Sequence, residues 1–570
     1  MSPSYHLNGL PADLRYEVLE KPHSYPRPMR IICVGAGAGG LLLAYKCRKN
    51  LKNIDVVCYE KNSEVGGTWF ENRYPGCACD VPVHNYAFSF EPNPNFSALY
   101  ASSAELKEYF QGFAKKYELM PMMELNCTVK SAVWDDDNGI YNVKIERDGK
   151  VFDDWCNFLI NGTGCLNDWK WPKIPGLHDF AGKLVHSAAW DDSIDVEGQT
   201  VGLIGTGSSA IQILPQIQKK AKHVESFMRS PTWIASPGFN MDETIDPKDA
   251  PGQQHYYTEE EKKRFRDDPE YFLKFRKDME VEFNLGFDMF IEGTEMSMTA
   301  QESLTKEMKR RIGPGHEELK KRLIPTFPPG CRRMTPGDGY LESLVQPNVT
   351  TVFSEIAKVV PEGIIDENDL LHSLDILICA TGFNLSFAPR FDLLGENGVT
   401  MEDEWELEPQ CYLALTAPKF PNYFIINGPR GNWGIGSALN THEVQVDYMV
   451  KMIKRIQAEN IKSLTVKQDA VNHLYQHMEA FHERTVWTAD CKSWYKNNIW
   501  GGKIWLWGGS ALHYMQTIMD PKYEHYDFKY LTPNIFSYLG NGLTQAQAAQ
   551  DKSKLSPYVR NSDTPWTLED

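Results

Sequence analysis

One stretch near the N-terminus of this 570-residue chain restricts the fold more than any other: "MRIICVGAGAGGLLLAYKCRK". An apolar run, Ile31–Val34, leads into Gly35, Gly37 and Gly40, and a helical pattern follows. This order predicts a strand, a tight turn and a helix, with glycines that let the backbone approach a pyrophosphate at the helix N-terminus. The next apolar strand ends at Glu60, whose carboxylate is placed to accept hydrogen bonds from ribose hydroxyls. The segment therefore predicts a dinucleotide-binding α/β domain.

The same arrangement recurs about 170 residues later in "TVGLIGTGSSAIQILPQIQKK". Gly205 begins this turn, and the strand after it ends at Arg229 and Ser230, where the first copy has Glu60. A carboxylate would repel a ribose 2′-phosphate, whereas a guanidinium binds one, so this site is expected to prefer NADPH over NADH. An exposed arginine without a ligand is the alternative. The residues expected to contact NADP in this turn are Thr206, Gly207, Ser208, Ser209, Ala210, Ile211 and Gln212.

Two such turns in one chain indicate a flavoprotein of α/β class with two Rossmann-like domains, the first for FAD and the second for NADPH. Two apolar segments, Asn157–Cys165 and Leu374–Phe383, contain a Thr-Gly pair and are interpreted as crossings between the domains. The expected organisation is an N-terminal arm (1–28), an FAD domain in two parts (29–165 and 390–518), a linker with the first part of the NADP domain (166–235), a helical insertion (236–332), the second NADP part (333–389) and a C-terminal surface segment (519–570).

Charge and cysteine content exclude several functions. A net charge of −17 argues against a nucleic-acid partner or an anionic membrane surface. The longest apolar run is too short to span a bilayer, and no signal peptide is recognisable, so a cytoplasmic protein is expected. The twelve cysteines contain no CxxC pair, so we expect reduced, mostly buried thiols and no metal site.

The stretch "FAGKLVHSAAWDD" carries Phe180, Gly182, His186 and Trp190 at fixed spacing. This pattern resembles the fingerprint of the flavin-dependent Baeyer–Villiger monooxygenase family, and the Trp-Asp ending favours that branch over related flavin-containing monooxygenases and N-hydroxylases. Because it lies between the two nucleotide turns, we interpret it as a linker. His186 and Trp190 are then expected to couple the position of the NADP domain to the active site, and Gly182 to permit close backbone approach.

Further segments resemble the family's cofactor loops. "GGTWFENRYPGCACDVPVHNYAFSF" resembles the flavin-contacting loop, and "FPPGCRRMTPGDGYLESL" resembles the segment with the active-site arginine. The family commonly has arginine where this chain has Ala78, so one cationic contact near the nicotinamide is expected to be missing. By position, the resemblance implies cofactor contacts for Thr68, Trp69, Phe70, Glu71, Ala78, Cys79, Asp80, Tyr86, Val129, Arg332, Arg333 and Trp494.

The resemblance implies that the enzyme inserts one oxygen atom from O₂ beside a ketone carbonyl, through a C4a-peroxyflavin, and forms an ester or lactone. An anion in a dry pocket needs a fixed cation, and Arg333 is the candidate because a guanidinium is always charged. Asp80 is the candidate for orienting it. The small-molecule ketone and the oligomeric state, whether a monomer or a small homo-oligomer, stay open.

Other functions remain as alternatives. The same cofactors could oxygenate nitrogen or sulfur, which requires a protonated hydroperoxide rather than the anion. A disulfide reductase using Cys77 and Cys79 is disfavoured by the CxC spacing. A flavin-binding protein without catalysis would need broken nucleotide turns, and both turns are intact.

Overall fold

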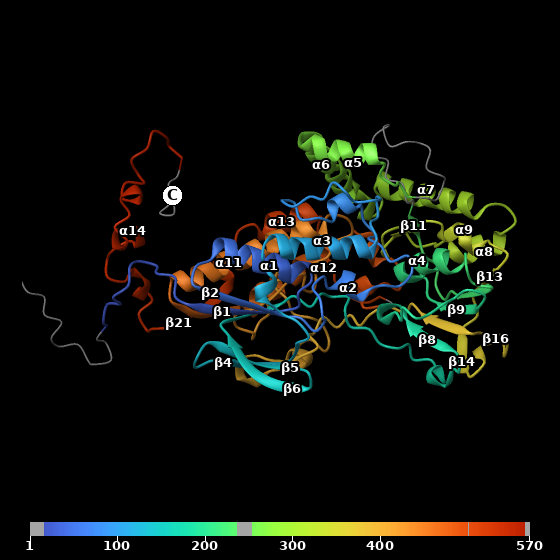
Figure 1. The fold of residues 1–570 in the computed structure, drawn as a ribbon, viewed down its shortest axis with the longest axis horizontal. Coiled ribbons are helices and arrows are strands. Elements are labelled where there is room, and N and C mark those ends of the chain that lie inside the picture. Colours follow the sequence, from blue (N-terminus) through green and yellow to red (C-terminus); the bar gives the residue numbers. More distant parts are fainter. Residues whose placement is uncertain (1–15, 236–253, 500, 565–570) are drawn as a thin grey trace, which may run out of the picture.

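The computed structural model describes residues 16–235, 254–499 and 501–564. It contains two five-stranded parallel sheets, one for each glycine turn (Figure 1). In the first sheet the strand order is β19-β7-β1-β2-β3. Strand β1 pairs in parallel with strands on both sides, because its side chains are apolar on both faces. The elements of this unit are β1 (Met29–Val34), α1 (Ala38–Asn50), β2 (Ile54–Tyr59), β3 (Met123–Glu124), β7 (Phe158–Asn161) and β19 (Tyr423–Ile425).

The second sheet has the order β13-β10-β9-β17-β8, with β9 between two parallel neighbours. The predicted pair of Rossmann-like domains is confirmed by these two parallel cores. The elements of this second unit are β8 (Lys183–His186), β9 (Thr200–Ile204), α4 (Ser208–Ile217), β10 (His223–Phe227), α9 (Tyr340–Leu344), β13 (Val349–Val352) and β17 (Ile376–Cys379).

Strand β8 corrects one sequence interpretation. The segment Phe180–Asp192 was expected to be a linker, but Lys183–His186 pairs in parallel with β17 at the edge of the second sheet. The linker interpretation is therefore wrong for these four residues, since Leu184 and Val185 beside the buried His186 form a short strand that the sheet can accept.

The first unit is completed by elements that return late in the chain. Helix α11 (Ala438–Ala458) packs on α1, and β18 (Asp392–Leu394) joins a smaller sheet with β4 (Thr128–Asp135), β5 (Ile140–Arg147) and β6 (Lys150–Cys156). Strand β20 (Ile461–Val466) pairs with β21 (Tyr526–Tyr530), so this unit extends past the expected boundary at 518.

The expected helical insertion contains four helices in its described part, and 236–253 lie outside the described residues. Figure 1 shows α5 and α6 standing above the first unit, whereas α7 and α8 lie beside α4 and α9 of the second. The insertion therefore contacts both units, because α6 meets the turn η2 (Val83–Asn85) and α7 meets α9. The helices are α5 (Glu259–Asp267), α6 (Pro269–Leu285), α7 (Glu295–Ile312) and α8 (Glu317–Leu323).

The two ends of the described chain lie together. His23 N donates to the Leu543 carbonyl at 2.7 Å, and Ser24 N donates to the Tyr538 carbonyl at 2.8 Å. Figure 1 shows the C-terminal segment with α14 (Gln545–Ala548) standing away from the body. The other elements are α2 (Thr68–Glu71), α3 (Ser103–Lys116), α10 (Met401–Glu404), α12 (Gln468–His482), α13 (Ala511–Ile518), β11 (Ile234–Ala235), β12 (Thr335–Pro336), β14 (Ile356–Val360), β15 (Gly363–Asp366) and β16 (Leu371–Ser373).

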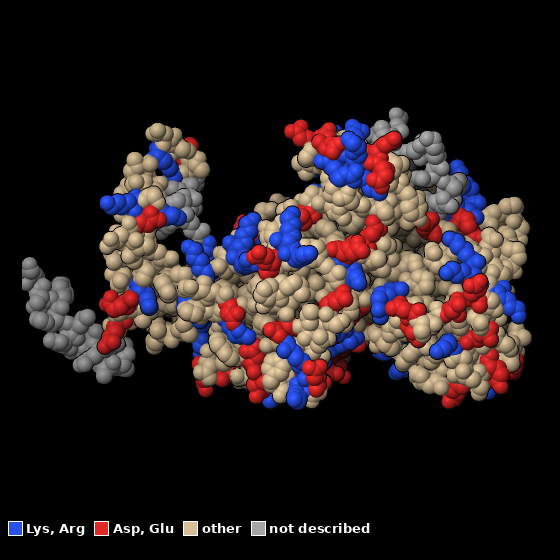
Figure 2. All heavy atoms as spheres, in the orientation of Figure 1, with Lys and Arg blue, Asp and Glu red and all other residues tan. Residues whose placement is uncertain are grey.

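Acidic and basic side chains are interspersed over the face in Figure 2, so this side of the molecule presents no continuous basic surface. Across the described ranges, no helix combines the length and the apolar character that a membrane crossing needs.

Candidate active site

The first glycine turn is held by a buried carboxylate. Glu60 Oε2 accepts the Ala36 N–H at 2.8 Å, and its Oε1 accepts the Asn62 N–H at 2.9 Å. Burial raises the pKa of Glu60. A Cβ on Gly67 would lie 2.8 Å from the Gly37 Cα, so two backbones meet here with no room for side chains. This backbone cradle at the N-terminus of α1 fits the pyrophosphate of FAD.

The loop that resembles the family's flavin contact wraps around this turn. Thr68, Trp69, Phe70 and Glu71 form α2, and the Trp69 ring meets Tyr86 edge-on with centroids 5.5 Å apart. Glu71 pairs with Lys61 at 2.7 Å, which positions this carboxylate toward the strand end. Val129 lies on β4 in the core that β4 shares with the first sheet.

One ion pair joins a segment of the first unit to a segment of the second. The first segment carries Asp80 and the second carries Arg333. Arg333 donates from Nε and Nη2 to the two carboxylate oxygens of Asp80, each at 2.7 Å. The Asp80 charge is the main reason that the pKa of Arg333 is raised, and the Tyr495 hydroxyl also contacts this guanidinium. Cys79 beside Asp80 is buried, and Ala78 forms a β-bridge to Ser102. Arg333 is thus kept charged and oriented by a fork-to-fork contact.

The second glycine turn leads into α4, which touches the flavin loop directly. Gln212 Nε2 donates to the Ala78 carbonyl at 2.9 Å, and the Tyr74 hydroxyl donates to Gln212 Oε1 at 2.8 Å. Ser208 shares a hydrogen bond of 2.6 Å with Thr335. A Cβ on Gly207 would meet no described atom within 4 Å, so the space in front of α4 is open. That space suits a phosphate at the helix N-terminus.

Two further cations flank this turn. Arg229 follows β10, and Arg332 donates from Nη1 to the Pro231 carbonyl at 3.2 Å. The pKa of Arg332 is lowered by burial and then by the nearby positive charge of Arg229. Like charges held this close favour an anion between them, and a 2′-phosphate has that charge. Of the other residues expected here, Thr206, Ala210 and Ile211 are buried, and Ser209 lies in the first turn of α4, where it contacts the Tyr74 hydroxyl.

The fingerprint residues pack at the base of the second sheet. The His186 ring stacks on Trp169 with centroids 4.6 Å apart, and its Nε2 lies 3.2 Å from the Thr381 hydroxyl. Burial lowers the pKa of His186 to about 4, so the ring is neutral near pH 7 and links β8 to the Thr-Gly crossing after β17. Phe180 and Trp190 are buried in two different apolar clusters.

Gly182 answers a steric need. A Cβ added to Gly182 would clash with the Asp375 carbonyl oxygen. It would also lie 2.6 Å from the Phe180 ring, which is too close for a carbon contact. The expected close backbone approach is therefore present, between the fingerprint and the residue that precedes β17.

Cysteine chemistry departs from the sequence expectation. Cys331 and Cys491 form a disulfide across 160 residues, with Cα atoms 6.5 Å apart, so the expectation of reduced thiols is wrong for this pair. The other ten cysteines are free. Sequence spacing could not reveal the pair because the partners are distant, although both sit inside motif segments, directly before Arg332 and three residues before Trp494. Sequence reasoning also missed Tyr495, which follows Trp494 and faces Arg333.

Several buried polar atoms near the first sheet lack a hydrogen-bond partner among the described residues. Cys165, just past the Thr-Gly crossing, contacts Asn432 and lies within electrostatic reach of Arg333. Unpaired buried polar atoms are costly, so a bound polar group or ordered water is expected to satisfy them. The set on η2, on the loop after β19 and on α11 comprises Asn85, Asn427, Asn432, Asn440 and His442.

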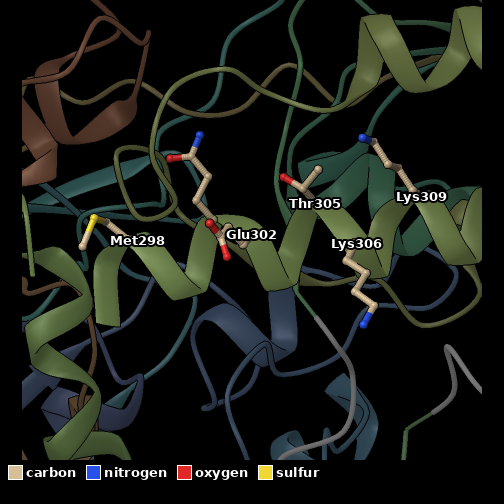
Figure 3. A pocket seen from close by; sticks show the side chains of 6 residues that line it. Met298, Glu302, Thr305, Lys306 and Lys309 are labelled. Atoms are coloured by element: carbon tan, nitrogen blue, oxygen red, sulfur yellow. The ribbon is translucent and has the colours of Figure 1, made fainter. Parts of the chain in front are cut away.

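A surface hollow of about 710 Å³ lies along helix α7 (Figure 3). All six residues that line it come from α7, including Met298, Glu302 and Lys309. No residue of the glycine turns or of the Arg333–Asp80 pair takes part, so we do not assign the reaction to this surface.

The fold and the site define a protein with two dinucleotide-binding folds that meet at one charged pair. Residues 33–103 match the family model of an NAD(P)-binding Rossmann-like domain. The chain is 40% identical over 536 residues to the FAD-binding monooxygenase tazF of Aspergillus terreus, covering 93% of this chain and 94% of that protein. It is 30% identical over 491 residues to a Baeyer–Villiger monooxygenase of Pseudomonas aeruginosa, covering 85% and 88%. The chain belongs to this family of FAD-binding monooxygenases.

Solved structures support the same fold. A cyclohexanone monooxygenase from Rhodococcus sp. Phi1 bound to NADP⁺ has a TM-score of 0.76 at 24% identity, covering 89% of this chain and all of that one. The complex of OTEMO with FAD and NADP has a TM-score of 0.75 at 23% identity, with the same coverage.

Proposed function

We propose that this chain is an FAD-containing, NADPH- and O₂-dependent Baeyer–Villiger monooxygenase that converts a small-molecule ketone into an ester or lactone. The observation that carries the proposal is the Arg333–Asp80 pair, which joins the flavin loop of one unit to the second unit. The resemblance of the fingerprint and the Pseudomonas relative support the reaction class.

When bound, reduced FAD together with O₂ supplies the oxygen nucleophile for the ketone carbonyl. Arg333 holds negative charge in the site, first on the nucleophile and then on the carbonyl oxygen as the new bond forms. Asp80 fixes the orientation of the guanidinium through two hydrogen bonds. Because both partners are partly shielded from water, the pair acts with less screening than a surface pair would.

NADPH supplies the reducing equivalents, and Arg229 with Arg332 holds its 2′-phosphate in this proposal. The open space before α4 and the proximity of the two guanidinium groups support the preference over NADH. Trp494, on the loop after the disulfide, is the proposed contact that closes over the nicotinamide side. We also propose a cytoplasmic location and a monomer or a small homo-oligomer, as expected from the sequence.

The decisive experiment compares Arg333→Ala with the wild type on a panel of ketones and one thioether. We expect the variant to keep its FAD and yellow colour, but to form ester roughly 10²–10³ times more slowly, because one preorganised charge is lost. Ester formation is measured by mass detection of one added oxygen atom with NADPH and O₂ present.

Arg310→Ala is the matched control, since Arg310 pairs with Glu307 on the exposed side of α7. This variant should behave as the wild type. Unchanged ester formation in Arg333→Ala would remove the assigned role. Oxygenation of the thioether with no product from any ketone would instead favour the heteroatom-oxygenating alternative.

A further inference from the structure

We propose that the Cys331–Cys491 disulfide is a redox-sensitive anchor that holds Tyr495 against Arg333, and that its reduction by a dithiol uncouples NADPH oxidation from ester formation. This inference rests on the proposed function, because coupling has meaning only for an oxygenating enzyme.

The position of the bond carries the argument. Cys331 lies two residues before Arg333, and Cys491 lies four residues before Tyr495. Tyr495 is buried, and burial raises the pKa of its phenol, while the facing Arg333 opposes that rise. The disulfide therefore joins the backbone of the proposed catalytic arginine to the backbone of the loop that faces it. A displacement of either segment is transmitted to the Arg333–Tyr495 contact.

Little regular structure holds this loop otherwise. Between Cys491 and Ile504 the described residues contain only the short turn η9 (Trp494–Lys496). Several hydrogen bonds inside the loop involve Ser493, whose carbonyl accepts the Lys496 N–H at 2.9 Å. One link to the next segment is the Trp505 N–H donating to the Tyr495 carbonyl at 2.8 Å. Tyr495 also packs in the apolar cluster that contains Phe290 and Trp487. The disulfide adds a covalent tie to this packing, so breaking it should make local opening of the loop easier.

A buried cation beside the bond indicates reactivity. Lys496 Nζ lies 3.9 Å from Cys331 Sγ and donates to the Ala489 carbonyl at 2.7 Å. Burial lowers the pKa of this lysine. An ammonium next to a sulfur stabilises the thiolate that leaves when a disulfide is attacked.

The redox step balances with a dithiol as the reductant. One thiolate of the dithiol attacks a sulfur of the pair and the S–S bond breaks. The second thiolate then closes the external disulfide and releases the other cysteine. The dithiol is oxidised by two electrons, and Cys331 and Cys491 take up those electrons and two protons. Because both sulfurs are buried, attack requires the loop to open first. Bound NADP⁺ is therefore expected to slow the reduction.

The test cycles the full FAD-loaded protein between oxidised glutathione and dithiothreitol. Alkylation and intact mass should count ten thiols in the oxidised form and twelve in the reduced form. Hydrogen exchange of 489–498 should be at least about tenfold faster after reduction. Ester formed per NADPH consumed should fall on reduction and recover on reoxidation. NADP⁺ should delay the appearance of the two new thiols.

Variants separate the anchor from general damage. Cys331→Ser with Cys491→Ser should be poorly coupled and insensitive to the dithiol, whereas Cys47→Ala, in the last turn of α1 and far from this loop, should respond as the wild type. Tyr495→Phe should keep the disulfide but lose coupling. Should the double variant not fold, the wild-type redox cycle gives the same comparison.

Each outcome decides one proposal. Twelve alkylated thiols after oxidation, or equal coupling in both redox forms, would overturn the anchor. Full coupling in Tyr495→Phe would overturn the role given to its hydroxyl. If the oxidised protein forms no ester, yet exchange of 489–498 still changes with redox state, the proposed function fails and the anchor of the loop stands.

Discussion

Arg333 illustrates how a single side chain depends on two distant segments. Its guanidinium has five donors, of which two are taken by Asp80 at 2.7 Å. Tyr495 also contacts the guanidinium, and the donors that neither partner takes can face a reacting oxygen, because the carboxylate occupies only one edge of the fork. A lysine could not reproduce this planar two-nitrogen contact, since its ammonium is a point charge without a planar edge.

His84 offers a test at the same scale. It is enclosed by aromatic rings with centroids 5.0–5.9 Å away, and burial lowers the pKa of its imidazole to about 3. The folded-state pKa is below that of the unfolded chain, so stability is present above pH 6.5 and is lost as pH falls toward 3. The rings are those of Phe96, Tyr257, Phe265, Phe272 and Phe275.

We therefore expect His84→Phe to lose less stability on acidification than the wild type. At pH 5 the unfolded wild type gains roughly 2 kcal/mol from protonating this histidine, and the variant cannot. Urea unfolding at pH 7.5 and pH 5.0 measures the difference. An identical pH dependence in both proteins would show that His84 does not set it.

Strand β8 shows that a motif can indicate the correct family while its position in the fold is predicted wrongly. The fingerprint spacing supports the family, but the same residues also form the edge strand of the second sheet. Lys183 N donates to the Asp375 carbonyl at 3.0 Å, next to the position where Gly182 has no room for a side chain. Both the strand and the motif therefore require a residue without a side chain at position 182.

Gly182→Ala should destabilise the protein by about 1–3 kcal/mol, because the added methyl forces β8 away from the start of β17. Thermal unfolding followed by circular dichroism gives the shift. Gly112→Ala is the control: it lies in α3 with nothing within 4 Å of the added Cβ among the described atoms, so it should be neutral or slightly stabilising. Equal melting temperatures for the two variants would contradict the steric account.

At the scale of the whole molecule, function depends on how the two units meet. Besides the ion pair, Gln212 links α4 to the flavin loop through Ala78 and Tyr74. The helical insertion contacts both units as well, through η2 and α9. The two units therefore meet through a small set of specific polar bonds and through apolar packing of Tyr74 and Cys77 against the core of the second unit.

Gln212→Ala removes two bonds between the units, each contributing about 1 kcal/mol, so the contact between α4 and the flavin loop should be weakened by roughly tenfold or more in its equilibrium constant. We expect unchanged FAD content and a lower yield of ester per NADPH, measured by product analysis against absorbance at 340 nm. Gln218→Ala, at the C-terminal end of the same helix, breaks a bond to Asn348 within the second unit and serves as the control. Equal yields in both variants would contradict the role of this contact.

Local sequence patterns predicted much of the fold and several residues of the candidate site. Short windows of sequence contain each glycine turn and the strands beside it. They also show that the second copy has Arg229 where the first copy has Glu60. Their geometry follows from backbone sterics and helix N-terminal charge, which depend on neighbours in the chain. The resemblance added Arg333 and Asp80 as candidates because their motifs are likewise local.

The amino-acid sequence by itself determined that this protein has two dinucleotide folds, in what order, and which residues begin each turn. Only the tertiary structure decided that Cys331 meets Cys491 across 160 residues, that Tyr495 faces Arg333, and that the fingerprint contributes a sheet strand. It also supplied the geometry of the contact between Asp80 and Arg333, which the sequence had only suggested. The physical reason is that periodicity and turn chemistry act over a few residues, whereas pairing between distant segments depends on how whole sheets and loops pack.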